Sequence, residues 1–260
     1  MPFFIRLNSI AIHTIEELGA LSKFGATFFR WIGQKPFRWK NLIDQMNVIG
    51  VDSTPIILLV SLFTGAVFAL QTGYAFRLFN AETLVGSTVG LSLTREIAPV
   101  FAALMVTARV GSAMAAELGT MRVTEQIDAL ESMAVNPFHY LVIPRIVGAT
   151  VMVPLLTGLF NFVGFMGAYM VGVGLLGIPE GPFVSRAEYY VDNEDLFGGL
   201  FKAAVFGFLL ALISCYQGYK AKGGAAGVGR ATTRAVVVSS VTILVVDYFL
   251  TQWILELIEK

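Results

Sequence analysis

The chain has 260 residues, of which 56% are hydrophobic and only 14% charged, and its formal net charge at pH 7 is zero. Soluble domains carry about 25% charged residues, so this composition indicates a polytopic membrane protein. The balanced charge gives no sign of a nucleic-acid partner. The single cysteine, Cys215, excludes an internal disulfide and a multi-cysteine metal site.

Residues 3–32 are predicted to form an amphipathic helix in the membrane interface. Apolar residues recur there every three or four positions, and charges such as Arg6, Glu16 and Lys23 interrupt them too often for a membrane crossing. A surface helix on a soluble core is the alternative reading, but the composition offers no such core. A basic stretch from Lys35 to Lys40 follows and favours contact with lipid headgroups. Residues 1–40 are therefore expected to form an interfacial segment.

Five apolar runs in residues 41–260 reach the roughly 20 residues needed to cross a hydrocarbon core. The fold class is therefore predicted to be all-α, with five transmembrane helices. The third run has 31 residues and contains Pro154, which predicts a tilt, a kink or an extension beyond the bilayer. The runs are 55–76, 86–110, 146–176, 197–219 and 235–258.

The distribution of lysine and arginine sets the predicted orientation. Outside the spans, the side that holds the N-terminus carries 12 of these residues and the opposite side carries 3. The positive-inside rule then places the N-terminus in the cytoplasm and the C-terminus, five spans later, on the outer side of the membrane. The acidic segment after the third span faces outward in this topology. It is predicted to contain a short helix near residues 180–195.

Ionisable side chains inside the apolar runs are the strongest functional signal, because each costs at least about 2.5–3.5 kcal/mol on insertion scales. Glu96 lies roughly ten residues into the second run, and Lys202 enters the fourth run from the opposite side to a similar depth, which predicts that the two lie close together. A structural ion pair and a functional pair are both compatible with this pattern. These intramembrane side chains are Arg95, Glu96, Arg109, Lys202 and Asp247.

Residues 121–136, between the second and third runs, are predicted to form a short amphipathic helix at the cytoplasmic side. Its acidic residues share one helical face and its apolar residues populate another. Such a helix fits docking into a groove of a partner protein, or a solvated surface position. The acidic face has Glu125, Asp128 and Glu131, and the apolar face has Ile127, Leu130 and Met133.

The chain shows no nucleotide, metal or catalytic motif. The glycines at 224–229 have phosphate-loop spacing, but Arg230-Ala231 replaces the Lys-Ser/Thr pair that contacts phosphate and Mg²⁺. The sequence therefore predicts a chain that is not an enzyme and binds no cofactor or metal. Any ATP hydrolysis that drives it would occur on another polypeptide.

Several sequence blocks, in order, resemble the MlaE (YrbE) family of ABC-transporter permeases. The resemblance covers nearly the whole chain from about residue 40. The blocks include Leu93-Thr-Arg-Glu-Ile-Ala-Pro-Val100, Ala116-Glu-Leu-Gly-Thr-Met-Arg-Val-Thr-Glu-Gln-Ile127, Met133-Ala-Val-Asn-Pro137 and Gly227-Val-Gly-Arg-Ala-Thr-Thr-Arg-Ala-Val236.

This resemblance implies a homodimeric permease in the bacterial inner membrane. It would act with two cytoplasmic ATPase subunits, which hold ATP and Mg, and with periplasmic MCE-domain subunits. The cargo would be phospholipid, moved between the inner membrane and the MCE components to maintain outer-membrane lipid asymmetry. Residues 121–136 would be the helix that couples to the ATPase, and Arg95, Glu96 and Lys202 would lie near a lipid cavity.

Phe68, Gln71 and Tyr74, at spacing i, i+3, i+6 in the first run, are predicted to line the same cavity. Two other functions stay open at this point. An ion-coupled transporter of a small polar solute would use Glu96 and Asp247 as proton carriers, but it usually shows internal repeats, and none is visible here. A membrane scaffold without transport would leave the buried charges unexplained.

Overall fold

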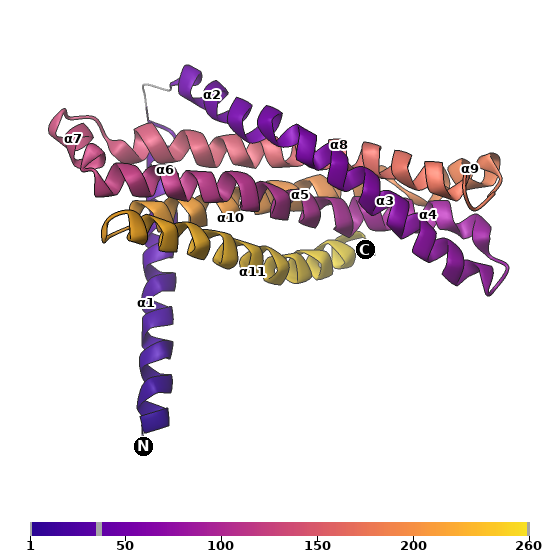
Figure 1. The fold of residues 1–260 in the computed structure, drawn as a ribbon, viewed down its shortest axis with the longest axis horizontal. Helices are drawn as coiled ribbons and strands as arrows, with labels where there is room; N and C mark the ends of the chain where they lie inside the picture. Colours follow the sequence, from indigo (N-terminus) through magenta and orange to yellow (C-terminus); the bar gives the residue numbers. More distant parts are fainter. Residues whose placement is uncertain (1, 35–37, 259–260) are drawn as a thin grey trace.

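The computed structural model describes residues 2–34 and 38–258, and these residues form helices joined by short turns (Figure 1). Three π-helical segments and two 3₁₀ segments interrupt the α-helices. The elements are α1 (Pro2–Trp31), α2 (Trp39–Gly50), η1 (Val51–Ser53), α3 (Thr54–Arg77), η2 (Glu82–Leu84), α4 (Val85–Ser92), η3 (Leu93–Ile97), α5 (Ala98–Val106), η4 (Thr107–Gly111), α6 (Ser112–Val123), α7 (Gln126–Ser132), η5 (Phe138–Val142), α8 (Ile143–Gly172), α9 (Glu180–Tyr190), α10 (Asn193–Tyr219) and α11 (Gly224–Ile258).

Five continuous helical stretches in the described residues are long and apolar enough to cross a membrane, which confirms the predicted number of spans. Several boundaries differ from the prediction, because hydropathy ends a span at the first charged residue whereas a helix continues if that charge is paired. Arg145, predicted in a loop, is buried inside α8 and donates to Leu141 O at 2.8 Å and to Glu117 Oε2 at 2.9 Å. The stretches are Trp39–Arg77, Glu82–Val123, Phe138–Gly172, Asn193–Tyr219 and Gly224–Glu256.

The spans form one elongated bundle (Figure 1). α10 packs against α8, α6 and α11, and α3 packs along α8. The close crossing of α3 and α8 depends on glycine, because a Cβ on Gly65 would collide with the backbone oxygen of Gly164. α7 and the α10–α11 turn lie at one end of the bundle, and α9 lies at the other (Figure 1).

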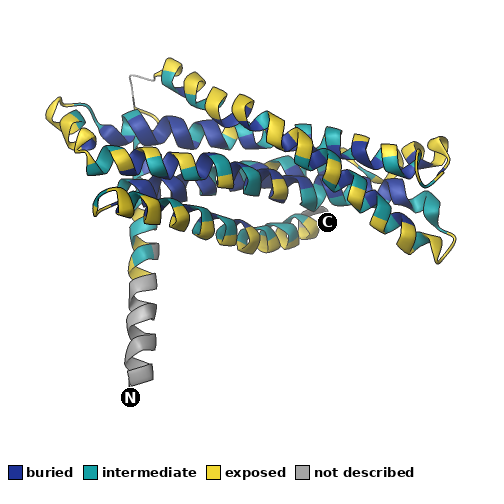
Figure 2. Ribbon diagram, viewed as in Figure 1, coloured by how far each residue is buried: buried dark blue, intermediate teal, exposed yellow. Residues whose placement is uncertain are grey.

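Burial separates the inner from the outer faces of these helices (Figure 2). The inner faces bury a continuous apolar core that includes Leu93, Phe160 and Phe206. The outer faces of α3 and α11 expose large apolar side chains, among them Phe63 and Phe249. Apolar surface on this scale is what helices show when they face lipid or another membrane-embedded protein surface.

α1 is a helix, as predicted, and it runs across the long axis of the bundle rather than along it (Figure 1). Its C-terminal part is anchored by aromatic contacts, including Phe24 with Phe138 at a centroid distance of 4.8 Å and Phe28 with Phe208 at 5.5 Å. Glu17 adds an ion pair with Arg234 at 2.5 Å. The predicted apolar pattern of side chains 3–14, and Lys35 to Phe37 of the basic stretch, lie outside the described residues.

The predicted single helix over residues 121–136 is wrong in extent. Met121 to Val123 belong to α6, and the separate helix α7 has only seven residues. The chain must reverse direction between α6 and α8, and it does so through two non-glycine residues with left-handed backbone, Glu125 (φ 59°) and Ala134 (φ 58°). The short helix predicted near residues 180–195 is present as α9.

Candidate functional site: a charged cluster between three spans

The site begins with a local break in the second span. η3 is a π-helical turn, and Pro99 follows it within the first turn of α5. Proline has no N–H to donate to the carbonyl four residues earlier, which here is Arg95 O. A wider turn of this kind accommodates the proline and is common at functional sites. It leaves Arg95 O available to a donor from another helix and presents Arg95 and Glu96 toward α10.

α10 supplies the facing side chains from one stripe of its surface. Asp195, Gly199 and Lys202 follow the i, i+4, i+7 spacing of a helical face. A Cβ on Gly199 would collide with the backbone oxygen of Thr94, so α10 can approach η3 this closely only with glycine at this position. The close approach brings Asp195 and Lys202, on either side of Gly199, within reach of Arg95 and Glu96.

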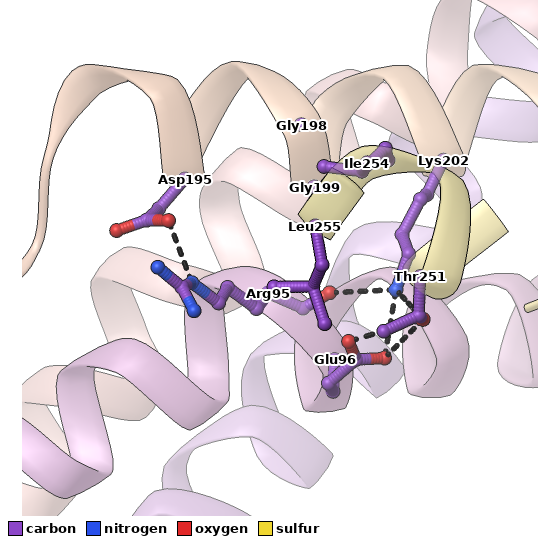
Figure 3. A pocket seen from close by; sticks show the side chains of 9 residues that line it. All are labelled: Arg95, Glu96, Asp195, Gly198, Gly199, Lys202, Thr251, Ile254 and Leu255. Carbon is purple, nitrogen blue, oxygen red and sulfur yellow. Dashed lines mark hydrogen bonds and ion pairs between the residues drawn. The ribbon is translucent and has the colours of Figure 1, made fainter. Parts of the chain in front are cut away.

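Lys202 is the centre of the cluster (Figure 3). Its side chain is 3% exposed, and its Nζ donates to Glu96 Oε2 at 2.7 Å, to Thr251 Oγ1 at 2.7 Å and to Arg95 O at 3.0 Å. Asp247 Oδ1 also lies 3.0 Å from Nζ but makes no hydrogen bond. The structure thus confirms the predicted proximity of Glu96 and Lys202, and it adds Asp247 to the same contact.

Arg95 and Asp195 form the second ion pair of the cluster (Figure 3). Arg95 Nε donates to Asp195 Oδ1 at 2.6 Å, and the Asp195 side chain is almost fully buried. The other carboxylate oxygen of Asp195 accepts from Asp192 N at 3.2 Å in a capping box that starts α10. Asp195 therefore fixes both the start of α10 and the direction of the Arg95 side chain.

A small pocket opens onto this cluster, lined by side chains of η3, α10 and α11 (Figure 3). The Glu96 side chain is 40% exposed and that of Arg95 is 35% exposed, whereas Lys202 is covered. The apolar side of the pocket comes from Ile254 and Leu255 on α11. The arrangement presents one carboxylate and one guanidinium side by side to whatever enters from outside the chain, which is the pattern that a group carrying both charges would match.

Arg109, the remaining predicted intramembrane charge, lies on the second π-helical turn, η4. It does not join the cluster. Its guanidinium donates to Ser53 Oγ at 2.9 Å and to Val48 O at 3.1 Å, and it lies 3.4 Å from the carboxylate of Asp52. These contacts tie the second span to α2 and η1, which form the N-terminal part of the stretch Trp39–Arg77.

The predicted cavity residues of the first span lie elsewhere on the surface. Gln71 and Tyr74 are exposed on α3, and Phe68 packs partly against the core. None of the three lines the pocket at Lys202. Their role in a lipid cavity stays a prediction, and a wall built from them would need a second protein surface opposite α3.

The residues predicted to engage an ATPase divide into two groups. Asp128, Glu131, Glu125 and Met133 are exposed, whereas Ile127 is fully buried and Leu130 is partly buried against the chain's own core. Asp128 also accepts from Arg122 Nη1 at 2.6 Å, which links α7 back to α6. Since Glu125 lies outside the helix, it does not share a helical face with Asp128 and Glu131 as the sequence pattern predicted.

Two members of the cluster, Asp195 and Thr251, were missing from the predicted site. Asp195 was assigned to the acidic loop, although Asp192-x-x-Asp195 has the spacing of a capping box and marks the start of a helix. Thr251 lies one helical turn after Asp247, so the two share a face of α11. Among the described residues, no group of three His, Cys, Asp or Glu side chains is placed to hold a metal ion.

Comparison with known proteins identifies one family. Residues 42–253 match the family model described as "Permease MlaE". The chain is 43% identical over 248 residues to a "Probable ABC transporter permease protein" of Rickettsia felis, with 94% of this chain and 96% of that protein covered. It is 38% identical over 250 residues to the "Intermembrane phospholipid transport system permease protein MlaE" of Haemophilus influenzae, with 94% and 95% covered.

A plant protein is also similar. The chain is 34% identical over 218 residues to "Protein TRIGALACTOSYLDIACYLGLYCEROL 1, chloroplastic" of Arabidopsis thaliana, with 84% of this chain and 62% of that protein covered. The family model extends from α2 to α11, so its matched region includes the spans that build the charged cluster.

Proposed function

Because the chain belongs to the MlaE permease family and is a multi-pass inner-membrane protein, we propose that it is the membrane subunit of an ATP-driven phospholipid transporter. The observation that carries this proposal is the match of residues 42–253 to the family, together with nearly full-length similarity to a phospholipid transport permease. The chain would move phospholipid between the inner membrane and periplasmic MCE-domain subunits. Its cellular role would be to maintain outer-membrane lipid asymmetry.

The charged cluster supports a cargo that is partly polar. Five ionisable side chains from three spans meet at one place, and a pocket leads to Arg95 and Glu96. Charges inside membrane spans are costly and usually mark a pathway for polar groups. A lipid headgroup would meet this cluster, while acyl chains would contact the apolar surfaces of α3 and α11. Two copies of the chain would enclose such a cavity between these exposed surfaces.

α7 is the proposed contact for the ATPase, which would bind ATP and Mg on its own chain. It lies at the same end of the bundle as the α10–α11 turn (Figure 1). Its buried Ile127 and the Arg122–Asp128 ion pair hold it to α6, so a push on its exposed residues reaches the second span directly. The second span carries η3 and η4, whose π-helical turns are places where a helix can change its register.

The orientation proposal places α7 in the cytoplasm. The end of the bundle that carries α7 also holds Arg122, Lys220 and Lys222. α9, at the other end, has one arginine and two glutamates. This asymmetry follows the positive-inside rule. α1 would then lie along the cytoplasmic interface, since it runs across the bundle axis (Figure 1).

Mild-detergent purification of the full-length chain from its own membranes tests the proposal. We expect an ABC-type ATPase and phospholipid to accompany it, at a stoichiometry of two permease chains per complex. A lone monomer that catalyses proton-coupled uptake of a small polar solute after reconstitution would overturn the proposal. That result would favour the rival role of Glu96 and Asp247 as proton carriers.

Charge reversal on α7 tests the coupling role. Glu131→Lys and Asp128→Lys should abolish co-purification of the ATPase while leaving the amount of inserted permease unchanged. Glu131 is the better test position, because it is exposed and forms no ion pair with any described residue, whereas Asp128 is paired with Arg122. Glu188→Lys, an exposed position on α9 at the opposite end, is the matched control and should retain the ATPase. Normal ATPase association in both α7 variants would refute the coupling role.

A further inference from the structure

The charged cluster contains more negative than positive charge. Glu96, Asp195 and Asp247 are its carboxylates, and Arg95 and Lys202 are its cations. Counted as fully ionised, the five side chains carry one uncompensated negative charge. An unbalanced charge inside a membrane span is costly, at least about 2.5–3.5 kcal/mol on insertion scales. Arg95 and Asp195 balance each other, so the excess lies at Lys202, where one ammonium faces the carboxylates of both Glu96 and Asp247.

Hydrogen bonding shows the same deficit independently. The Lys202 ammonium has three N–H donors, and all three are used on Glu96, Thr251 and the backbone oxygen of Arg95. Asp247 Oδ1 is buried, lies 3.0 Å from the same nitrogen and has no hydrogen-bond partner. A buried carboxylate oxygen without a donor is unfavourable. The cluster therefore lacks one hydrogen-bond donor at Lys202, the place where carboxylates outnumber cations.

The pocket at Glu96 limits the size of the missing group. It has room for the centre of little more than one water-sized group. A primary ammonium group is close to water in size, whereas a trimethylammonium group is much larger. Glu96 is the carboxylate that such a group would reach first, because its side chain is the most exposed of the three.

Arg95 supplies the matching site for an anion next to the ammonium. Only its Nε donates to Asp195, so the two terminal nitrogens of the guanidinium have no hydrogen-bond partner in the described part of the chain. A guanidinium with two free terminal nitrogens is well suited to a phosphate. Arg95 and Glu96 line the same pocket (Figure 3). The pocket thus presents a phosphate-binding group beside an ammonium-binding group.

From these observations we infer that the cluster recognises a zwitterionic phospholipid headgroup that carries a primary ammonium, of the ethanolamine type. The ammonium donates to Glu96, and one Lys202 N–H is released from Glu96 to Asp247, which removes the unpaired oxygen. The phosphate accepts from the terminal nitrogens of Arg95. The inference rests on the proposed phospholipid transport and adds the headgroup class to it.

Lipid retention by the purified full-length chain tests the inference. The protein is equilibrated in detergent with an equimolar mixture of phosphatidylethanolamine, its mono- and dimethyl forms, phosphatidylcholine and phosphatidylglycerol, all with the same acyl chains. It is then repurified, and the retained lipids are quantified by mass spectrometry. We expect phosphatidylethanolamine to exceed phosphatidylcholine and phosphatidylglycerol by about tenfold, the factor that corresponds to 1.4 kcal/mol, with a stepwise loss along the methylation series.

A variant pair locates the preference. Glu96→Gln should reduce the preference for phosphatidylethanolamine to near parity while the total lipid retained per protein stays the same. Asp44→Asn, at an exposed position on α2 outside the cluster, should keep the preference of the unaltered chain. The methylation series needs no variant, so the test holds even if Glu96→Gln fails to fold.

The outcomes separate the two proposals. Equal retention of all five lipids by the unaltered chain would overturn the headgroup inference and leave phospholipid transport standing. That result is expected if a proton or a water completes the cluster instead. Equal retention of phosphatidylglycerol and phosphatidylethanolamine would also overturn it, because phosphate alone would then be recognised. Retention of no phospholipid at all would count against the proposed function itself.

Discussion

Replacement of Lys202 by methionine is the most direct test of the cluster's energetics. Methionine keeps an unbranched chain of similar length but removes the cation that, within the described residues, contacts both Glu96 and Asp247. Removal of one partner from a buried ion pair costs about 3–5 kcal/mol, because the other charge stays buried without compensation. Asp247, with 18% of its side chain exposed, carries most of this cost here. Glu96 carries less, since its 40% exposure allows hydration from the pocket.

The assay is thermal unfolding in detergent, followed by tryptophan fluorescence. For a chain of this length about 1 kcal/mol corresponds to roughly 2–4 °C in Tm, so Lys202→Met should lower Tm by about 6 °C or more. Lys222→Met, at an exposed position in the α10–α11 turn, is the matched control and should leave Tm nearly unchanged.

A neutral cluster provides the second half of the test. The triple variant Lys202→Met, Glu96→Gln, Asp247→Asn removes the charges together, and buried ion pairs replaced by neutral groups are often as stable as the original. It should therefore recover most of the Tm that Lys202→Met loses, while phospholipid transport stays lost. A Lys202→Met variant as stable as the unaltered chain would refute the charge argument. Restored transport in the triple variant would show that the cluster only locks helix packing.

Two further pairs of variants test the backbone arguments by thermal unfolding. Gly65→Ala should lower the free energy of unfolding by about 1–3 kcal/mol, because its Cβ would collide with Gly164 O. Gly158→Ala should raise it by about 0.5–1 kcal/mol, because no atom lies within 4 Å of the new Cβ. Equal effects of the two substitutions would refute the close α3–α8 crossing. Glu125→Gly should raise the free energy of unfolding by about 0.5–1 kcal/mol, because glycine adopts the left-handed backbone at φ 59° without strain. Glu131→Gly, inside α7, should lower it by about 1 kcal/mol. Destabilisation by both glycines would mean that Glu125 is not strained.

Hydropathy alone was sufficient to find the five spans, because each contains an apolar run long enough to cross a membrane. It was insufficient for their ends. α6 continues past the predicted end of the second span because Glu117 is paired with Arg145 of α8, a residue 28 positions away. α7 is shorter than the pattern of acids and aliphatics predicted, because the reversal between two spans requires left-handed turns that the pattern does not encode.

The sequence by itself determined which ionisable residues lie inside apolar runs. A charge inside an apolar run is costly wherever it lies, so Glu96, Lys202 and Asp247 were recognisable one at a time, and depth along the helices predicted the first pair. Only the tertiary structure decided that Asp247 joins them, that Arg95 turns instead to Asp195, and that Arg109 leaves the cluster for Ser53. The physical reason is that ion pairing depends on how helices rotate and how closely they approach. Here the approach is set by Gly199 against Thr94 O, and the turn by Pro99.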